Sequence, residues 1–388
     1  MTRPLLPLQE APRDLFVLRF SALGDVCQMV PVIRSISSQW PETRITWCLG
    51  RPEYELLGDI PGIEFVLFEK SRGWRAYRDL RNKTKSRCFD VMMHAQFSMR
   101  SNLASRMVRT GIRLGYDRQR SKDLHGLFVT HRIPPANGQH VMDSYFSFAE
   151  TLGITQRDVR WEIPIPDEAQ SFARSALPDE APVLLINPCS SHALRNWPPE
   201  RFAQVGDYAA SHHGFQVVLC GGRTKQEKDA GQQIANAMNQ AVINLIGKDT
   251  IKQLLAILAR AQILITPDSG PMHMATAVGT PVIGLHAASN PERSGPYFSR
   301  QWCVNRYDDA AIQFLGKSAK QIRWGTKIER PGVMNLVTID DVVGKLDALL
   351  DHQSRLSDSR GATLSNKETT GDDSGSPPND KDQQEQGE

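Results

Sequence analysis

Three short segments of the sequence carry side chains that could move a proton or hold a phosphate group. The first, residues 16–36, predicts a strand, a tight turn and a helix, with Gly24 relieving the turn and Asp25 at the mouth of the helix. A carboxylate in that place can cap the helix or serve as a base that faces a cleft, and the spacing leaves both roles open. Ser21 and Ala22 stand where a G-x-G-x-x-G dinucleotide motif has glycines, which disfavours a dehydrogenase.

The second segment, residues 187–198, follows a predicted strand and carries Ser190, Ser191 and Arg195. Two hydroxyls and a fixed positive charge can bind a diphosphate. A surface loop with an incidental arginine would have the same pattern, so this segment alone does not decide between the two.

The third segment, residues 264–286, predicts a strand, a small-residue loop and a helix with Pro271 in its first turn. The free backbone N–H groups of such a helix start can bind phosphate. His273 lies in the same turn, where it can donate to a phosphate oxygen. A lone helical histidine is often structural, but after Asp-Ser-Gly-Pro we expect a ligand contact.

Alternating strands and helices must position these segments. Such alternation predicts parallel sheets with helices on both faces, and we expect an α/β protein with two doubly wound, Rossmann-like halves that face one another across a cleft. The predicted strands are 15–20, 44–49, 64–68, 89–94, 183–187, 216–220, 242–245, 262–266 and 281–285, and the predicted helices are 26–40, 52–58, 74–86, 100–109, 199–213, 225–238, 250–260, 271–278 and 339–350.

Composition and length predict where the domains lie. A chain of 388 residues exceeds the size of a single core, so two domains are expected. The first is predicted at 14–165 and the second at 183–337, joined by a linker at 166–182. A C-terminal helix is expected at 338–352, and the polar composition of 353–388 predicts a disordered tail.

The sequence predicts a cytoplasmic protein. No stretch approaches the roughly 18 apolar residues of a membrane span, and the first 13 residues lack the apolar core of a secretory signal. The six cysteines have no C-x-x-C spacing, which favours buried free thiols over a zinc or disulfide framework. The acidic pairs at 308–309 and 340–341 are interpreted as turn or cap acids, not metal ligands.

The formal charge of +3 hides a basic segment, residues 70–122, with fifteen Lys or Arg against three Asp. This segment is either a solvated surface or a binding face for an anionic lipid or a phosphorylated acceptor. Nucleic acid is disfavoured because no known RNA- or DNA-binding pattern accompanies the charge.

The ordered set of motifs resembles glycosyltransferase family 9, the ADP-heptose lipopolysaccharide heptosyltransferases. SALGDV, PCSSHALRNWP and PDSGPMHMATAVGTPVIGL occur in the family's order and approximate spacing, and the resemblance spans residues 14 to 350. It implies a GT-B architecture with an acceptor-binding domain first, a nucleotide-sugar domain second, and a terminal helix that returns toward the first. It also implies inverting transfer without metal or cofactor.

The resemblance assigns roles to individual residues. The catalytic base falls on Asp25, supported by a loop that includes Ser21 and Gly24. The donor phosphate and nucleotide contacts fall on Ser190, Ser191, Arg195, Asp268, Ser269, Gly270 and His273. Arg195 departs from the family's frequent lysine. A donor carboxylate of some members aligns near Thr224, so that contact is not assigned.

The implied partners are a nucleotide-diphosphate sugar and an anionic, lipid A-linked acceptor, with peripheral contact to the inner membrane through the basic segment. Two alternatives stay open at this point: a sugar-nucleotide epimerase of the same architecture and a non-catalytic nucleotide-sugar binding protein. The sequence does not specify the sugar, the nucleobase, the acceptor hydroxyl or the oligomeric state.

Overall fold

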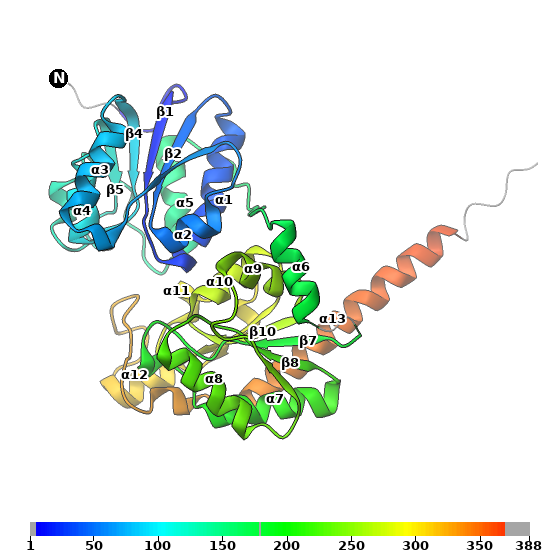
Figure 1. Cartoon of the computed structure of the whole chain (residues 1–388). Coiled ribbons are helices and arrows are strands. Elements are labelled where there is room, and N and C mark those ends of the chain that lie inside the picture. Colours follow the sequence, from blue (N-terminus) through cyan, green and yellow to red (C-terminus); the bar gives the residue numbers. More distant parts are fainter. Residues whose placement is uncertain (1–4, 178–179, 369–388) are drawn as a thin grey trace, which may run out of the picture. The chain divides into compact units, whose positions relative to one another are not determined.

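Two six-stranded parallel sheets form the framework of the protein in the computed structural model, which describes residues 5–177 and 180–368, with side chains up to residue 357 (Figure 1). The first sheet has the strand order β3-β2-β1-β4-β5-β6 and the second β12-β11-β10-β7-β8-β9. All described strand pairs are parallel. This confirms the predicted α/β class with two doubly wound halves, called here the first and second lobe.

Within residues 5–165, the first lobe has six strands and five α-helices. Figure 1 shows α1 and α5 on one side of its sheet and α3 and α4 on the other. Its strands are β1 (Asp14–Leu18), β2 (Arg44–Leu49), β3 (Ile63–Leu67), β4 (Phe89–His94), β5 (Thr110–Gly115) and β6 (His131–Arg132). Its helices are α1 (Leu23–Gln39), α2 (Arg51–Leu57), α3 (Trp74–Thr84), α4 (Met99–Ser105) and α5 (Val141–Leu152), with short 3₁₀ turns η1 (Lys70–Arg72) and η2 (His125–Leu127).

The second lobe repeats the scheme. Its strands are β7 (Val183–Ile186), β8 (Gln216–Leu219), β9 (Val242–Asn244), β10 (Ile263–Pro267), β11 (Val282–His286) and β12 (Val304–Asn305). The helices that follow β6 are α6 (Asp167–Ala176), α7 (Pro199–His213), α8 (Lys225–Ala237), α9 (Ile251–Arg260), α10 (Gly270–Ala277), α11 (Pro291–Ser294), α12 (Tyr307–Leu315) and α13 (Ile339–Glu368), with 3₁₀ turns η3 (Ala193–Arg195), η4 (Arg300–Trp302) and η5 (Val333–Leu336).

The central strands are buried on both faces because helices cover the sheets on both sides. Every residue of β1, β7, β10 and β11 is buried. Leu15 and Val17 belong to one core cluster, with α1 and α5, while Phe16 and Leu18 belong to a second, with α3. Continuous apolar runs of this kind are expected of parallel strands inside an α/β fold.

The structure differs from the sequence prediction in several places. Strands β5, β6 and β12 and helices α5, α11 and α12 had not been predicted. Helix α6 occupies much of the predicted linker, because residues 167–176 form an amphipathic helix that buries Ala169 and Ala173. Helix α13 continues to Glu368, into the range predicted as a disordered tail. The rest of that tail, 369–388, lies outside the described residues.

The prediction of buried free thiols is confirmed for five of the six cysteines, whereas Cys88 is free but exposed. Among the predicted cap acids, Asp308 accepts from the Ala319 N–H and Asp341 pairs with Arg306. None of the described helices is long and apolar enough to cross a bilayer.

Candidate active site

The strand order brings the three motif segments to the sheet edges where ligands bind. In each sheet the order reverses between two central strands, β1 and β4 in the first and β7 and β10 in the second. Ligands of such sheets lie at the carboxyl ends of strands at this reversal. The Asp25 segment follows β1, the Arg195 segment follows β7, and the His273 segment follows β10. All three motifs therefore sit where a doubly wound sheet places its ligand.

Asp25 lies in the first turn of α1 and three groups hold its carboxylate. The Arg19 guanidinium contacts Oδ2 through Nη2 at 2.5 Å. The backbone N–H of Ala22 donates to the same oxygen at 3.1 Å, and the Tyr145 hydroxyl donates to Oδ1 at 2.8 Å. Asp25 thus closes the start of α1, and its side chain still keeps 30% of its area exposed.

The surroundings of Asp25 keep it ionised. Burial raises the pKa of its carboxyl, but the positive charge of Arg19 and the hydrogen bonds from Ala22, Tyr145 and Arg19 outweigh burial, and the pKa is lowered overall. Arg19 is itself buried, with Nη1 donating to the carbonyl oxygen of Ala95 at 2.7 Å. A charged carboxylate is the form that can accept a proton at neutral pH.

His273 of the second lobe lies directly against the start of α1. A Cβ atom placed on Gly24 would come within 2.4 Å of His273 Cδ2, so a glycine at this position allows the close approach. The Gln28 amide contacts His273 Nδ1 at 3.2 Å. Burial lowers the pKa of His273 even though the carboxylates of Asp268 and Asp25 oppose that effect. The ring is therefore neutral at pH 7 and sits beside the predicted base.

The loop after β10 is braced from inside the second lobe. The Ser269 hydroxyl bonds with Thr266 Oγ1 at 2.8 Å and accepts from the Asn187 amide at 3.1 Å. Asp268 accepts from the Ser294 hydroxyl at 3.3 Å. Gly270 is the first residue of α10 and lies 3.5 Å, measured from an ideal Cβ, from Leu23 of the first lobe. These bonds fix the start of α10 opposite the start of α1.

The loop after β7 carries the predicted cationic contact. Arg195 Nε donates to Glu329 Oε1 at 2.8 Å, and only 12% of the Arg195 side chain is exposed. The Ser190 N–H donates to Asn196 Oδ1 at 2.8 Å, whereas the Ser190 hydroxyl is buried and has no hydrogen-bond partner among the described residues. Ser191 is exposed. The hydrogen-bonding capacity of the Ser190 hydroxyl is therefore unused among the described residues.

Neighbouring charges connect these residues into one group. Asp25 and Asp268 both act on the pKa of His273. Burial raises the pKa of Asp268, but His286, Lys327 and His273 lower it overall. Lys327 in turn lies near Arg195. Asp25 therefore lies beside His273. Arg195 is connected to this pair by charge interactions that run through Lys327 and Asp268.

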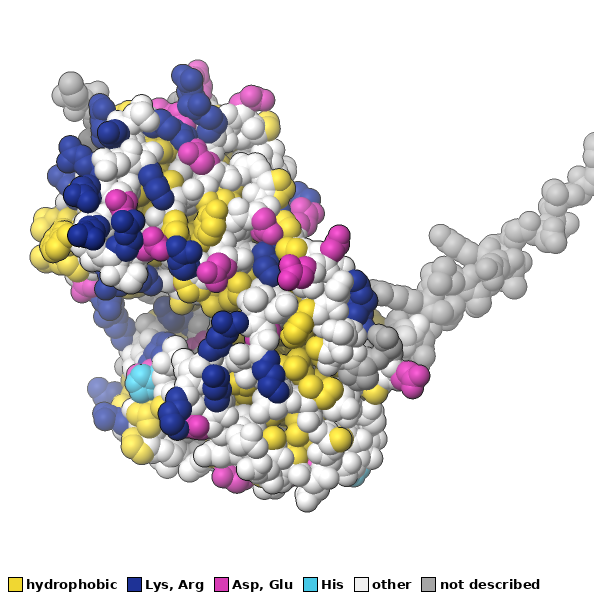
Figure 2. All heavy atoms as spheres, viewed as in Figure 1, with side chains coloured by type: hydrophobic (Ala, Val, Ile, Leu, Met, Phe, Trp, Pro, Cys, Tyr) yellow, Lys and Arg dark blue, Asp and Glu magenta, His cyan; other side chains and the backbone are white. Residues whose placement is uncertain are grey.

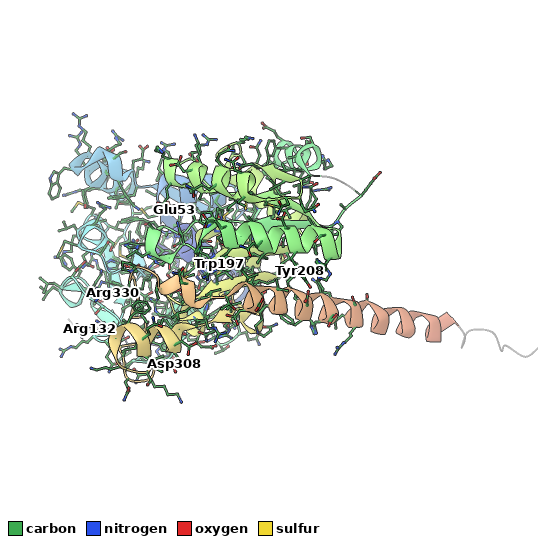
Figure 3. The ribbon with its side chains drawn as sticks, turned by 90° about the horizontal axis from the view of Figure 1, so that it is seen from below. Glu53, Arg132, Trp197, Tyr208, Asp308 and Arg330 are labelled. Atoms are coloured by element: carbon green, nitrogen blue, oxygen red, sulfur yellow. The ribbon has the colours of Figure 1, made fainter. Side chains whose placement is uncertain are left out.

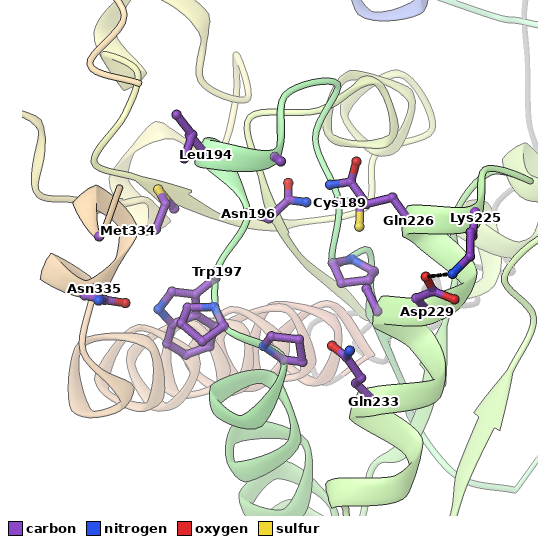
Figure 4. A pocket seen from close by; sticks show the side chains of 16 residues that line it. Cys189, Leu194, Asn196, Trp197, Lys225, Gln226, Asp229, Gln233, Met334 and Asn335 are labelled. Atoms are coloured by element: carbon purple, nitrogen blue, oxygen red, sulfur yellow. Dashed lines mark hydrogen bonds and ion pairs between the residues drawn. The ribbon is translucent and has the colours of Figure 1, made fainter. Parts of the chain in front are cut away.

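A separate cavity of about 580 Å³ lies between the loop after β7 and the first turns of α8 (Figure 4). Cys189, Asn196 and Trp197 line one side, and the ion pair between Lys225 and Asp229 lies on the other. The side chain of Arg195 belongs to the same loop but does not line this cavity. The cavity adjoins the predicted donor loop without containing the predicted phosphate contacts.

Several residues of the site had escaped the sequence analysis. Arg19 had a signal, a charge inside the apolar run LFVLRF, but Tyr145, Gln28 and Glu329 had none, because their contacts arise only from the fold. Glu53, labelled in Figure 3, is 5% exposed, and its Oε2 has no hydrogen-bond partner among the described residues. The predicted loop residue Ser21 accepts a hydrogen bond from Lys70 at 2.8 Å.

Comparison with known proteins identifies the family of the chain. Residues 77–321 match the family model of glycosyltransferase family 9 (heptosyltransferase). The chain is 34% identical over 340 residues to the lipopolysaccharide core heptosyltransferase OpsX of Haemophilus influenzae, covering 88% of this chain and 98% of that protein. It is 25% identical to lipopolysaccharide heptosyltransferase 3 of Escherichia coli, with coverages of 84% and 96%.

Solved structures show the same fold. A family 9 glycosyltransferase from Veillonella parvula superposes with a TM-score of 0.72 at 23% identity, over 88% of this chain and 97% of that one. The ADP-heptose lipopolysaccharide heptosyltransferase II of E. coli superposes with a TM-score of 0.68 at 20% identity, over 88% and 99%. The predicted GT-B architecture is thereby confirmed, and the chain belongs to glycosyltransferase family 9, the heptosyltransferases.

Proposed function

We propose that this enzyme transfers heptose from ADP-heptose to the lipid A-linked inner core of lipopolysaccharide, on the cytoplasmic face of the inner membrane. The names of its relatives support the sugar and the pathway, since they include a lipopolysaccharide core heptosyltransferase at 34% identity. The observation that carries the chemistry is the Asp25 carboxylate at the start of α1, which pairs with Arg19 and lies beside His273 at the start of α10.

The reaction is a single displacement at the anomeric carbon. The acceptor hydroxyl oxygen forms the new bond to that carbon and its proton passes to Asp25. The bond from carbon to phosphate oxygen breaks, and its electron pair leaves with the nucleoside diphosphate. Such a transition state resembles an oxocarbenium ion, as in inverting sugar hydrolysis. The configuration at the anomeric carbon inverts because attack and departure occur on opposite faces.

The second lobe stabilises the leaving group. Negative charge grows on the diphosphate as the bond breaks, so donors aimed at it favour the transition state over the intact donor. Arg195, the Ser190 hydroxyl and the N–H groups at the start of α10 are the donors we assign, together with His273. Glu329 would share Arg195 with the incoming diphosphate. With these donors the reaction proceeds without a metal or cofactor.

The first lobe binds the acceptor and meets the membrane. Figure 2 shows Lys and Arg side chains gathered beside hydrophobic ones on the face over α3 and α4. Arg75, Arg78 and Arg100 are exposed there, and Trp74 exposes 77% of its area. Basic residues attract anionic lipid headgroups, and tryptophan favours the membrane interface. This surface suits peripheral contact with the leaflet that carries a phosphorylated, lipid-linked acceptor.

Product analysis tests the proposal. The enzyme is incubated with ADP-heptose, with and without a Kdo-lipid A acceptor, in the presence of EDTA. We expect heptosylated acceptor and ADP only when both substrates are present, at a rate that EDTA leaves unchanged. A new sugar nucleotide formed from the donor alone would show an epimerase instead. Binding of ADP-heptose with no product under either condition would show a binding protein.

A further inference from the structure

Both oxygens of the Asp25 carboxylate are engaged by the protein, but not equally. Oδ2 receives two donors, Arg19 Nη2 at 2.5 Å and the Ala22 N–H at 3.1 Å. Oδ1 receives one, the Tyr145 hydroxyl at 2.8 Å. An ionised carboxylate has about two acceptor positions on each oxygen. Among the described residues, therefore, Oδ2 has its full set of donors and Oδ1 has one position left.

Tyr145 is itself held in place. It is 1% exposed and lies on α5, which packs against α1 in the core of the first lobe. The Arg19 guanidinium lies over its ring, 5.3 Å from Cζ to the ring centre. Arg19 thus contacts Asp25 through its nitrogens and Tyr145 through its face. Arg19 and Tyr145 therefore hold the Asp25 carboxylate in one orientation, Arg19 at Oδ2 and Tyr145 at Oδ1.

We propose that Oδ1 of Asp25 is the atom that takes the acceptor proton, and that Tyr145 is the positioning residue that presents it. The proposal rests on the function proposed above. The acceptor hydroxyl donates to the open position of Oδ1 while Tyr145 fills the other, and its proton transfers there as the oxygen bonds the anomeric carbon. Arg19 and the Ala22 N–H hold Oδ2 and prevent the carboxylate from rotating.

If the proposal is right, the pH dependence of transfer depends on the Tyr145 hydroxyl. Charged or titratable groups from several elements face Asp25: Arg19 after β1, Glu53 on α2, Cys27 on α1, Tyr116 after β5, Tyr145 on α5 and His273 on α10. Of these, only Arg19 and Tyr145 donate a hydrogen bond to the carboxylate among the described residues. Removing the Tyr145 donor raises the pKa of Asp25, so protonation of the base sets in at higher pH.

The test compares Tyr145→Phe with Tyr116→Phe. Tyr116 is a buried tyrosine of the same cluster whose hydroxyl bonds Ser144 and not Asp25. For each variant, kcat/KM with ADP-heptose and Kdo-lipid A is measured as a function of pH, and the affinity for ADP is measured by calorimetry. We expect Tyr145→Phe to shift the acidic limb of the kcat/KM pH profile to higher pH. We also expect it to lower kcat by about tenfold, which corresponds to the loss of one hydrogen bond to a charged group. The ADP affinity of both variants and the pH profile of Tyr116→Phe should match those of the wild type.

Three outcomes decide the matter. An acidic limb that stays in place in Tyr145→Phe, or moves equally in Tyr116→Phe, would overturn the inference while leaving the transferase intact. Wild-type enzyme that makes no heptosylated acceptor would overturn the proposed function instead. If Tyr145→Phe does not fold, wild-type enzyme grown with 3-fluorotyrosine gives a second measurement. Its more acidic phenol donates a stronger hydrogen bond, so the limb moves to lower pH, and an unmoved limb contradicts the proposal.

Discussion

Two carboxylates of the first lobe, the partly exposed Asp25 and the buried Glu53, have opposite surroundings. Asp25 has charged and neutral donors, and its pKa is lowered overall. Glu53, on the neighbouring helix α2, is 5% exposed with an unpartnered Oε2, and burial raises its pKa although Lys70 and Arg19 oppose this effect. A Cβ on Gly50 would lie 2.4 Å from that oxygen, so glycine makes room for the carboxylate. Environments that separate two carboxyl pKa values mark functional sites.

Glu53→Gln should stabilise the fold at neutral pH. A carboxyl whose pKa is raised in the folded state destabilises the protein above that folded pKa and has no effect below its unfolded pKa. The gain in melting temperature should therefore be present at pH 7 and vanish as pH falls below about 4.3, the ordinary pKa of a free glutamate. Thermal melts across pH measure it. Glu55→Gln, an exposed glutamate on the same helix, serves as the control and should show no gain.

Site residues that lie in local sequence motifs could be predicted from the sequence. Site residues that come from distant parts of the chain could not. Asp25, Arg195 and His273 sit in contiguous motifs whose order along the chain is informative. Tyr145 comes from a helix 120 positions away from Asp25, and no local pattern connects the two. The roles of Asp25 in catalysis and of Arg195 and His273 in donor binding stay predictions.

At the scale of elements, the first turn of α10 approaches the first turn of α1 closely at Gly24. The sequence predicted helix at 26–40, but α1 begins at Leu23, which places Asp25 inside the first turn. This shift of three residues decides which groups face His273. The predicted strands before each motif were right to within a few residues, because continuous apolar runs identify buried parallel strands.

Gly24→Ala should disrupt this meeting point. The new methyl group would lie 2.4 Å from His273 Cδ2, far inside contact distance, so the ring or α10 must move. We expect transfer to fall by about tenfold to a hundredfold, as misplacing groups by about 1 Å can cost that much. Steady-state rates measure it. Gly344→Ala is the matched helical control, because nothing lies within 4 Å of its added methyl, and it should leave the rate unchanged.

At the scale of the whole molecule, charge is distributed unevenly. The chain carries a formal net charge of +3, yet residues 70–122 hold fifteen basic and three acidic side chains. Arg72 pairs with Asp79 and is therefore not the best probe of this surface. Arg75, Arg78 and Arg81 are exposed on α3. The basic segment could be predicted from sequence, but its free and paired members could be told apart only in the structure.

Replacing Arg75, Arg78 and Arg81 with Gln should weaken binding to vesicles that contain anionic lipid. At about 1 kcal/mol per basic residue, the three changes lower affinity by about a hundredfold, and added salt should weaken the wild type in the same direction. Vesicle co-sedimentation measures it. The control replaces Lys248, Lys317 and Lys320 with Gln, three exposed lysines of the second lobe. Equal binding by both triple variants would reject the membrane surface.

The most direct test of the account is the transfer rate of Asp25→Asn, measured together with its affinity for ADP. The amide keeps the shape of the carboxylate but cannot take the acceptor proton. A general base contributes about a hundredfold to ten-thousandfold, so we predict a loss in kcat of that size with ADP affinity within about twofold of wild type. Asp167→Asn, an exposed first-turn acid of α6, should keep full activity. An Asp25→Asn enzyme that transfers heptose at the wild-type rate would contradict the account.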